Sequence, residues 1–194
     1  MKLSDFFDFE VISSDSRQIF KEMTIGTDKI SADIREKLPH HQIDIVNPDQ
    51  HYTAGQWQKD TIEIIENLQS KGKKAMIVGG TGLYIDTLYK NFAMPEVAPD
   101  YELRKRLYAE EKSAAGWLHK ELEKVDPESA EKIHPNCDRH LVRALEIYEK
   151  TGTPKSVLSK EKPVQWPLLM LGLRRDRDES NHLIDVRIKE MLSE

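Results

Sequence analysis

The feature that most constrains the fold is a glycine-rich turn, Gly-Gly-Thr-Gly at residues 79–82, set between a short apolar run and a helical pattern. The run covers residues 75–78, and the helical pattern begins at Leu83. Two further apolar runs, residues 9–13 and 43–46, also end abruptly in polar or turn-forming residues. Short strands that alternate with helices are typical of a mainly parallel sheet with crossover helices. The sequence therefore predicts an α/β fold.

Helix signals are strongest over residues 53–72, where Thr53 can cap the first turn and Gly72 can end the helix in a left-handed conformation. Trp57, Ile65 and Leu68 fall on one face of this helix, together with Ile64.

From Pro95 onward, charged helical stretches follow one another without a convincing strand, which predicts a helical insertion. Its clearest helix covers residues 138–150 and ends before Gly152. Strand character returns at residues 168–173, and residues 179–192 are again helical in pattern. The expected organisation is a first part of the α/β core at 1–95, a helical insertion at 96–163 and a return to the core at 164–194.

Charge and cysteine content narrow the functional classes. The 194 residues carry 29 Lys and Arg against 34 Asp and Glu, a net charge of −5, so any polyanion site must be local. The single cysteine excludes a disulfide framework and indicates a reducing compartment. No apolar run approaches the roughly 20 residues that span a bilayer, and the first residues lack a basic signal-peptide flank. We expect a cytoplasmic protein without a membrane partner.

Asp15 is the first candidate for chemistry, because it follows the strand at residues 9–13 and is flanked by Ser14 and Ser16. Open α/β sheets bind ligands beyond the carboxyl ends of their strands, so Asp15 could act as a general base. Alternatively, Ser14 or Asp15 caps the next helix or orders the turn.

The turn at residues 79–82 also allows two interpretations. Its backbone N–H groups and the Thr81 hydroxyl could receive a phosphate or a nucleotide edge. Tight packing between a strand and a helix would explain the glycines equally well. The turn lacks the Gly-Lys-Ser/Thr ending of the phosphate-binding loop of nucleotide hydrolases.

Arg139 and Arg143 lie four residues apart on the predicted helix, so their guanidinium groups could project together at phosphates or base edges. A solvated helix face is the alternative, with Glu146 three residues further on able to neutralise Arg143. His134, Cys137 and His140 make an incomplete ligand set, so we predict no metal site there.

The order and wording of several blocks resemble tRNA dimethylallyltransferases, the IPP transferase family. The blocks are VISSDSRQIF at 11–20, IGT at 25–27, PHHQIDI at 39–45, residues 52–58, VGGTGLY at 78–84, IHPN at 133–136, then Arg139 and RALEIY at 143–148. The resemblance spans nearly the whole chain.

The resemblance implies a P-loop-NTPase-like, mainly parallel sheet with a helical insertion domain. Family members begin with a strand and a phosphate-binding loop resembling G-x-T-x-S-G-K-T, whereas MKLSDFFDFE stands in their place here. The first strand and that loop are thus expected to be missing, and the chain is expected to stop before the family's later helices. A truncated, catalytically inactive remnant that still binds tRNA is the alternative to an active enzyme.

The implied activity is tRNA modification by a prenyltransferase. A dimethylallyl group would move from dimethylallyl diphosphate to N6 of the adenosine 3′ of the anticodon, which must be flipped out of its stack. The implied partners are the tRNA anticodon stem-loop and dimethylallyl diphosphate, with Mg²⁺ as cofactor, and the family is expected to act as a monomer. The implied fold also binds nucleotides such as ATP.

Family roles then attach to named positions. Asp15 would be the general base, and Arg187 a diphosphate-binding residue, while Leu183 stands where the family has a second arginine. His140 replaces an arginine, which makes one cationic contact dependent on pH. The implied tRNA-binding residues are Asp15, Ser16, Arg17, Gln18, Thr81, Arg104, Arg139, His140, Leu141, Val142 and Arg143.

Overall fold

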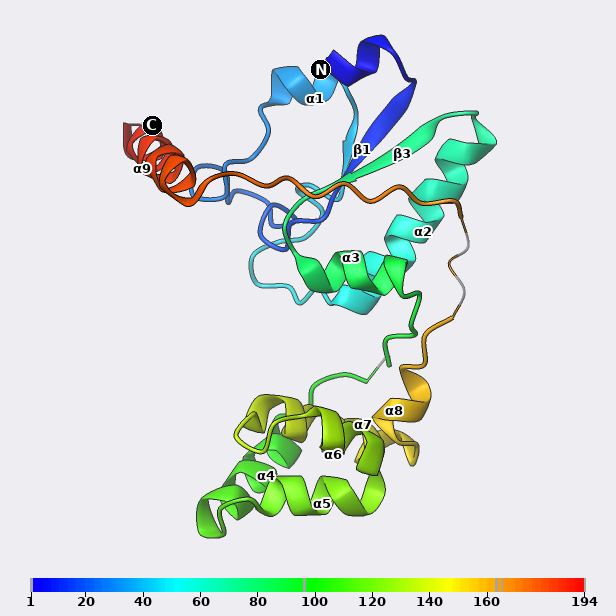
Figure 1. Cartoon of the computed structure of the whole chain (residues 1–194), viewed down its shortest axis with the longest axis vertical. Coiled ribbons are helices and arrows are strands. Elements are labelled where there is room, and N and C mark those ends of the chain that lie inside the picture. Colours follow the sequence, from blue (N-terminus) through cyan, green and yellow to red (C-terminus); the bar gives the residue numbers. More distant parts are fainter. Residues whose placement is uncertain (1, 96, 163, 165, 194) are drawn as a thin grey trace. The chain divides into compact units, whose positions relative to one another are not determined.

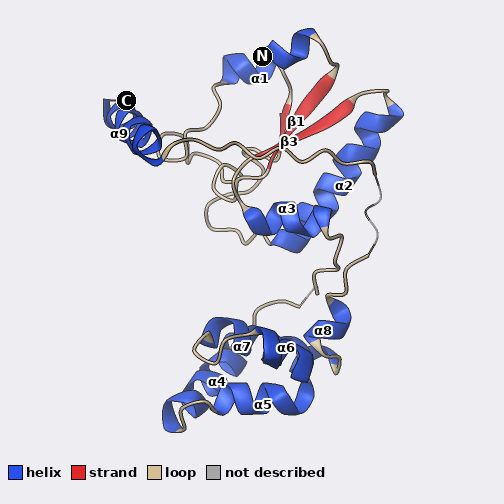
Figure 2. Ribbon diagram, viewed as in Figure 1, coloured by secondary structure: helices blue, strands red, loops and turns tan. Residues whose placement is uncertain are grey.

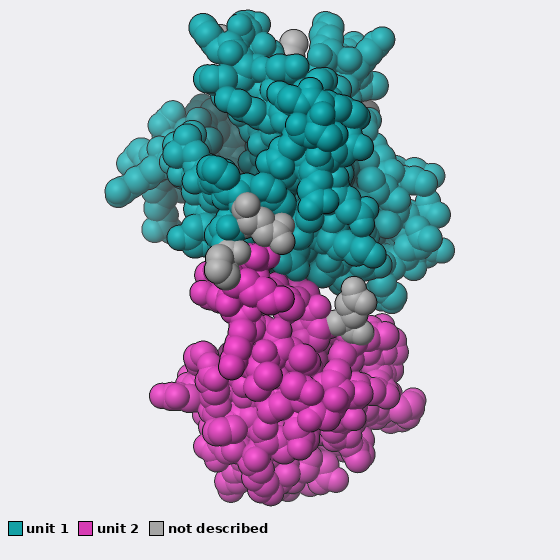
Figure 3. Space-filling model, turned by 90° about the vertical axis from the view of Figure 1, so that its right-hand side faces the viewer, with its two compact units in different colours: residues 1–89, 164–194 teal, residues 90–163 magenta. Residues whose placement is uncertain are grey.

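The computed structural model of the chain describes residues 2–95, 97–162, 164 and 166–193. The chain divides into two compact units, which Figure 3 shows in different colours. The first unit combines Met1–Tyr89 with Val164–Glu194, and the second is Lys90–Pro163. The first boundary therefore falls before the expected one at residues 95 and 96.

A parallel sheet of three strands forms the centre of the first unit (Figure 2). The strands are β1 (Phe9–Ser13), β2 (His40–His41) and β3 (Lys74–Val78), in the order β2-β1-β3. β1 pairs along its whole length with β3, from Phe9 opposite Lys74 to Ser13 opposite Val78. The predicted α/β class and the strands at the first and third apolar runs are confirmed.

The second strand lies elsewhere than predicted. It covers His40–His41 instead of residues 43–46, and Val46 forms only an isolated bridge with Phe20. Gln42 and Asp44 have positive φ angles of 62° and 57°, which turn the chain out of the extended conformation. The apolar run at residues 43–46 is therefore an irregular segment.

The helical segments described in the first unit are η1 (Lys2–Asp5), α1 (Ala32–Lys37), α2 (Ala54–Ser70), α3 (Gly82–Tyr89) and α9 (Arg177–Ser193). α2 begins at a capping box, in which Thr53 Oγ1 accepts from Gln56 N at 3.2 Å and Gln56 Oε1 accepts from Thr53 N at 2.9 Å. Gly72 follows its end with φ 73°, as predicted.

Trp57 fixes α2 to its neighbours. Its side chain is fully buried and stacks on Tyr84 of α3, with ring centroids 4.7 Å apart. Its indole Nε1 donates to the carbonyl of Ser13 at 3.0 Å, at the end of β1. α2 also contacts β3, and Figure 1 shows the two elements side by side. These contacts hold the start of α3 close to the carboxyl end of the sheet.

The strand predicted at residues 168–173 is absent from the structure. This segment is irregular, and Leu169, Leu171 and Leu173 expose 83%, 79% and 102% of their surfaces. A strand requires a hydrogen-bonded neighbour, and in the described sheet β1, β2 and β3 pair only with one another. The apolar pattern of residues 168–173 predicts an extended conformation but says nothing about a pairing partner.

The described residues of the second unit form helices and connecting loops, which confirms the helical insertion. The helices are α4 (Tyr101–Ser113), α5 (Trp117–Val125), α6 (Pro127–Lys132), α7 (Asp138–Thr151) and α8 (Lys155–Leu158). Leu107, Leu118, Leu122 and Leu141 are almost completely buried between them. Among the described helices of the whole chain, none is long and apolar enough to cross a membrane.

Candidate functional site

The carboxyl ends of β1 and β3 meet at the glycine-rich turn. Ser14 N donates to Val78 O at 2.8 Å, so strand pairing continues one residue beyond β1. Thr81 then joins the two chain segments twice, because its N–H donates to Ser14 O at 3.1 Å and its Oγ1 accepts from Ser16 N at 3.1 Å. The structure thus brings the predicted residues Ser16 and Thr81 together.

Close packing explains one glycine of this turn. A Cβ atom at Gly79 would lie 2.5 Å from Ser14 Oγ, 2.6 Å from Ser14 C and 2.8 Å from Ser14 O. Gly80 and Gly82 have no such neighbours within 4 Å. The packing interpretation of the turn therefore holds for Gly79, while the turn's exposed side stays accessible at Gly80 and Gly82.

Asp15 lies half-buried immediately after β1. Its Oδ1 accepts from Arg17 N at 2.7 Å and from Gln18 N at 3.3 Å, so the carboxylate orders the turn that follows. Among the described residues, Oδ2 has no hydrogen-bond partner. One oxygen of Asp15 therefore holds the loop and the other is available to a ligand.

Charged and polar groups surround Asp15. Burial raises the pKa of the Tyr84 hydroxyl, with the Asp15 carboxylate adding to the rise and Arg17 opposing it. Gln18 Nε2 donates to the carbonyls of Thr27 and Asp28 at 3.1 and 3.2 Å. The side chain of Gln18 thereby fixes the loop that contains residues 25–27.

Arg187 of α9 reaches the same loop. Its Nη2 lies 2.6 Å from Asp28 Oδ2, and both side chains are more than half exposed. The predicted diphosphate-binding residue is thus an ion-pair partner of the loop that Gln18 holds. An exposed pair of this kind contributes little to stability.

Sequence reasoning missed the ion pairs that shape the chain between α1 and α2. Asp44 binds Lys29 Nζ at 2.6 Å and Arg35 Nη1 at 2.7 Å, and the side chain of Lys29 is only 1% exposed. Burial alone would raise the pKa of Asp44, but these two donors outweigh it and hold that pKa below its usual value. Asp44 N also donates to Gln18 O at 3.1 Å. The PHHQIDI block contains Asp44, but nothing local indicated its partners.

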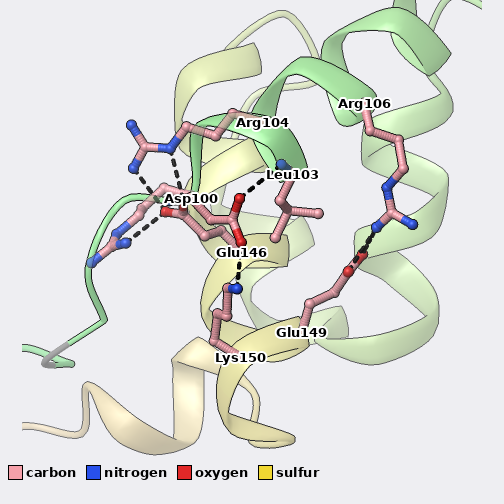
Figure 4. A network of polar contacts seen from close by, with 8 residues as sticks. Asp100, Leu103, Arg104, Arg106, Glu146, Glu149 and Lys150 are labelled. Carbon is pink, nitrogen blue, oxygen red and sulfur yellow. Dashed lines mark hydrogen bonds and ion pairs between the residues drawn. The ribbon is translucent and has the colours of Figure 1, made fainter.

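In the second unit, a buried carboxylate, Glu146, joins two of the predicted arginines, and Figure 4 shows it with one of them, Arg104. Glu146 of α7 has no exposed surface. Arg104 of α4 donates to it through Nε at 2.8 Å and Nη2 at 2.7 Å, and Arg143 through Nη1 at 2.6 Å. Neutralisation of Arg143 by Glu146, the alternative left open by spacing, is observed. Its guanidinium nevertheless stays about one third exposed, at 32%.

The remaining residues of the predicted recognition segment point in different directions. Arg139 and His140 are exposed in the first turn of α7. Leu141 and Val142 expose only 0% and 2% of their surfaces, because they belong to the apolar core of this unit. The prediction that these two residues bind tRNA stays a prediction, and any such contact would come from their backbone because their side chains are buried. The 3.6-residue period of a helix places only part of any contiguous segment on a surface.

The described residues contain no cluster of three or more His, Cys, Asp or Glu side chains arranged to hold a metal ion. The sequence also contains no Gly-Lys-Ser/Thr loop that could supply a hydroxyl ligand. Within the described part of the chain, no protein ligand set for Mg²⁺ is therefore assigned.

The sheet is parallel, polar side chains lie beyond its strand ends, and a helical unit interrupts the first unit in sequence. These features define the class of ligand-binding α/β proteins with a helical insertion. A family model described as IPP transferase matches residues 18–194. The chain belongs to the IPP transferase family.

Curated relatives share this assignment. A tRNA dimethylallyltransferase of Herpetosiphon aurantiacus is 39% identical over 196 residues, covering 100% of this chain and 62% of the relative. One of Thermotoga petrophila is 42% identical over 183 residues, covering 94% of this chain and 60% of the relative. The chain thus spans about three fifths of the length of these relatives.

Solved structures that the chain resembles belong to proteins of the same kind. A tRNA isopentenylpyrophosphate transferase of Bacillus halodurans matches with a TM-score of 0.60 and 35% identity, over 99% of this chain and 60% of that chain. A eukaryotic dimethylallyltransferase acting on tRNA matches with a TM-score of 0.80 and 31% identity, over 99% of this chain and 48% of that chain.

Proposed function

We propose that this chain takes part in transferring a dimethylallyl group from dimethylallyl diphosphate to N6 of the adenosine 3′ of a tRNA anticodon. Its relatives are named tRNA dimethylallyltransferases. The carrying observation is the Asp15 carboxylate, fixed through Oδ1 by two backbone N–H groups and open at Oδ2. Such a group accepts a proton from a bound substrate without first reorganising.

The proposed reaction uses Asp15 at the exocyclic amine of adenine. The nitrogen N6 attacks C1 of the dimethylallyl group, a bond forms between them, and the bond between C1 and the diphosphate oxygen breaks. The electron pair leaves with diphosphate, and the N6 proton passes to Asp15. Ser16, Arg17, Gln18 and Thr81 would hold the anticodon loop beside Asp15, since Thr81 and Gln18 fix the two segments that flank it.

A second contact with the same RNA would come from the helical unit. We propose that Arg104, Arg139, His140 and Arg143 contribute it, with the backbone of residues 141 and 142 running between them. Arg187 is proposed to bind diphosphate, after leaving Asp28. Mg²⁺ is proposed on family grounds alone; we assign it no ligand in this chain and derive no step through it. We also propose a cytoplasmic location and a monomer.

The test uses fluorescently labelled anticodon stem-loop RNA with adenosine or guanosine 3′ of the anticodon. Adenine offers an N6 donor to a carboxylate, whereas guanine places the O6 acceptor there. We expect the chain to bind the adenosine RNA about tenfold tighter, as one well-placed polar contact allows. The Asp15→Asn variant keeps an oxygen for the turn but loses the charge, and we expect it to lose most of this preference.

Asp33→Asn is the matched control, because Asp33 is exposed in the first turn of α1 and its replacement changes the net charge equally. Transfer of labelled dimethylallyl to RNA is the second readout, and Asp15→Asn should lower any transfer at least about 100-fold. A chain that binds neither RNA would refute the proposal. Binding of the adenosine RNA without transfer would favour the inactive remnant.

A further inference from the structure

The Glu146 carboxylate accepts more hydrogen bonds than a single surface ion pair provides. Besides Arg104 and Arg143, the backbone N–H of Asp100 donates to its Oε1 at 2.8 Å. Burial alone would raise the pKa of Glu146, but these donors outweigh it and hold that pKa below its usual value. The carboxylate is therefore charged at neutral pH. It accepts hydrogen bonds from Asp100 and Arg104, at the start of α4, and from Arg143 of its own helix.

This arrangement leaves part of each arginine for another ligand. The side chains of Arg104 and Arg143 are 31% and 32% exposed, although Glu146 itself is 0% exposed. Arg104 Nη1 has no partner among the described residues, and Arg143 Nη2 donates to Val97 O at 2.9 Å. Each guanidinium is thus held at fixed atoms, while about a third of each arginine side chain stays exposed. Fixed forks of this type suit the paired oxygens of a phosphate.

We infer that Glu146 is a positioning residue for RNA binding, which holds Arg104 and Arg143 side by side as a paired clamp for the phosphodiester backbone. The inference rests on the proposed function. Two guanidinium groups that bind the same carboxylate oxygen would repel each other, and the buried carboxylate between them offsets that repulsion while leaving the three side chains one net positive charge. Glu146 then strengthens binding to a polyanion, although it is itself an anion.

The direction in which one substitution changes RNA affinity separates this role from plain neutralisation of Arg143. Glu146→Gln preserves the shape of the side chain and raises the net charge of the chain by one. If Glu146 only neutralises Arg143, RNA binding becomes tighter and its salt dependence steeper. If Glu146 positions the arginines, binding weakens, and we expect about a tenfold loss, the scale of one lost specific contact.

Glu149→Gln is the matched control. Glu149 lies on the same helix, pairs with Arg106 at 2.7 Å and is 40% exposed, so its replacement changes the net charge equally without touching the clamp (Figure 4). We expect RNA affinity in this variant to be unchanged or slightly higher. Binding is measured by fluorescence anisotropy with the adenosine stem-loop RNA, over a series of salt concentrations.

Glu146→Asp covers the case in which Glu146→Gln does not fold. It keeps the charge but withdraws the carboxylate by one methylene, so neutralisation predicts unchanged affinity and positioning predicts a loss. Circular dichroism confirms folding at the temperature of the assay. Wild-type binding that both variants retain would overturn the inference alone, whereas absence of wild-type binding would overturn it together with the proposed function.

Discussion

Replacement of Gly79 by alanine tests whether close packing at the strand ends builds the site. The added Cβ would meet the carbonyl carbon and oxygen of Ser14 at 2.6 and 2.8 Å, and backbone atoms cannot move aside as a flexible side chain can. Ser14 O accepts from Thr81 N at 3.1 Å, and Ser14 N continues the pairing with Val78 at 2.8 Å. Relief of the clash must therefore disturb the connection between β1 and the turn.

The cost follows from these contacts. Overpacking of a well-packed interior costs about 1 to 3 kcal/mol, and the loss of the hydrogen bond between Thr81 and Ser14 adds about 1 kcal/mol. We expect Gly79→Ala to lower the free energy of unfolding of the first unit by roughly 2 to 4 kcal/mol. Gly80→Ala is the control, since nothing lies within 4 Å of a Cβ there. Its effect should stay within about 0.5 kcal/mol.

The assay is hydrogen–deuterium exchange of peptides from β1 and β3, which reports opening of the first unit separately from the second. Urea unfolding followed by circular dichroism gives the global value. Equal stability of the two variants would refute the reasoning, because it would mean that the approach of Ser14 to Gly79 is not constrained.

Two further predictions concern caps and charge. Thr53→Ala removes the capping box of α2 and should cost about 1 kcal/mol in urea unfolding, whereas Ser31→Ala, at an N-cap without a side-chain hydrogen bond, should cost little; equal losses would contradict the role of the cap. The hydrogen bond from Lys73 lowers the pKa of Glu10 below its ordinary value of 4.5 in the folded protein. Glu10 therefore stabilises the fold above the pKa of the unfolded chain, and this contribution is lost as pH falls through the folded pKa. Urea unfolding of Glu10→Gln should therefore depend less on pH between about 5 and 3 than the wild type, and identical slopes would count against the pair.

Local signals explain what the sequence predicted correctly. Thr53 caps the start of α2 and Gly72 follows its end, and each acts on residues within one helical turn of itself. A short stretch of sequence around each residue is therefore enough to predict it. The same holds for α7, where apolar residues at intervals of three and four face the core and Gly152 ends the helix with φ 67°. Asp15 also acts locally, on Arg17 and Gln18.

Long-range contacts explain the failures. Residues 168–173 have strand character but pair with no strand of the described sheet, and residues 43–46 are turned aside by Asp44, whose partners Lys29 and Arg35 lie before β2. Arg104 and Glu146 are 42 residues apart in sequence. No periodicity within one segment indicates a contact of that kind.

The distribution of acids reconciles a net charge of −5 with the polyanionic partner that we propose. Acidic residues weaken RNA binding when their charge faces the phosphates, but Glu146 is fully buried and faces two guanidinium groups. Asp15 directs one oxygen to backbone N–H groups and would offer the other to a neutral base rather than to a phosphate. Both acids therefore act on the geometry of the donors around them. Counting charges over the chain cannot detect such a site, whereas the sign of the response to Glu146→Gln can.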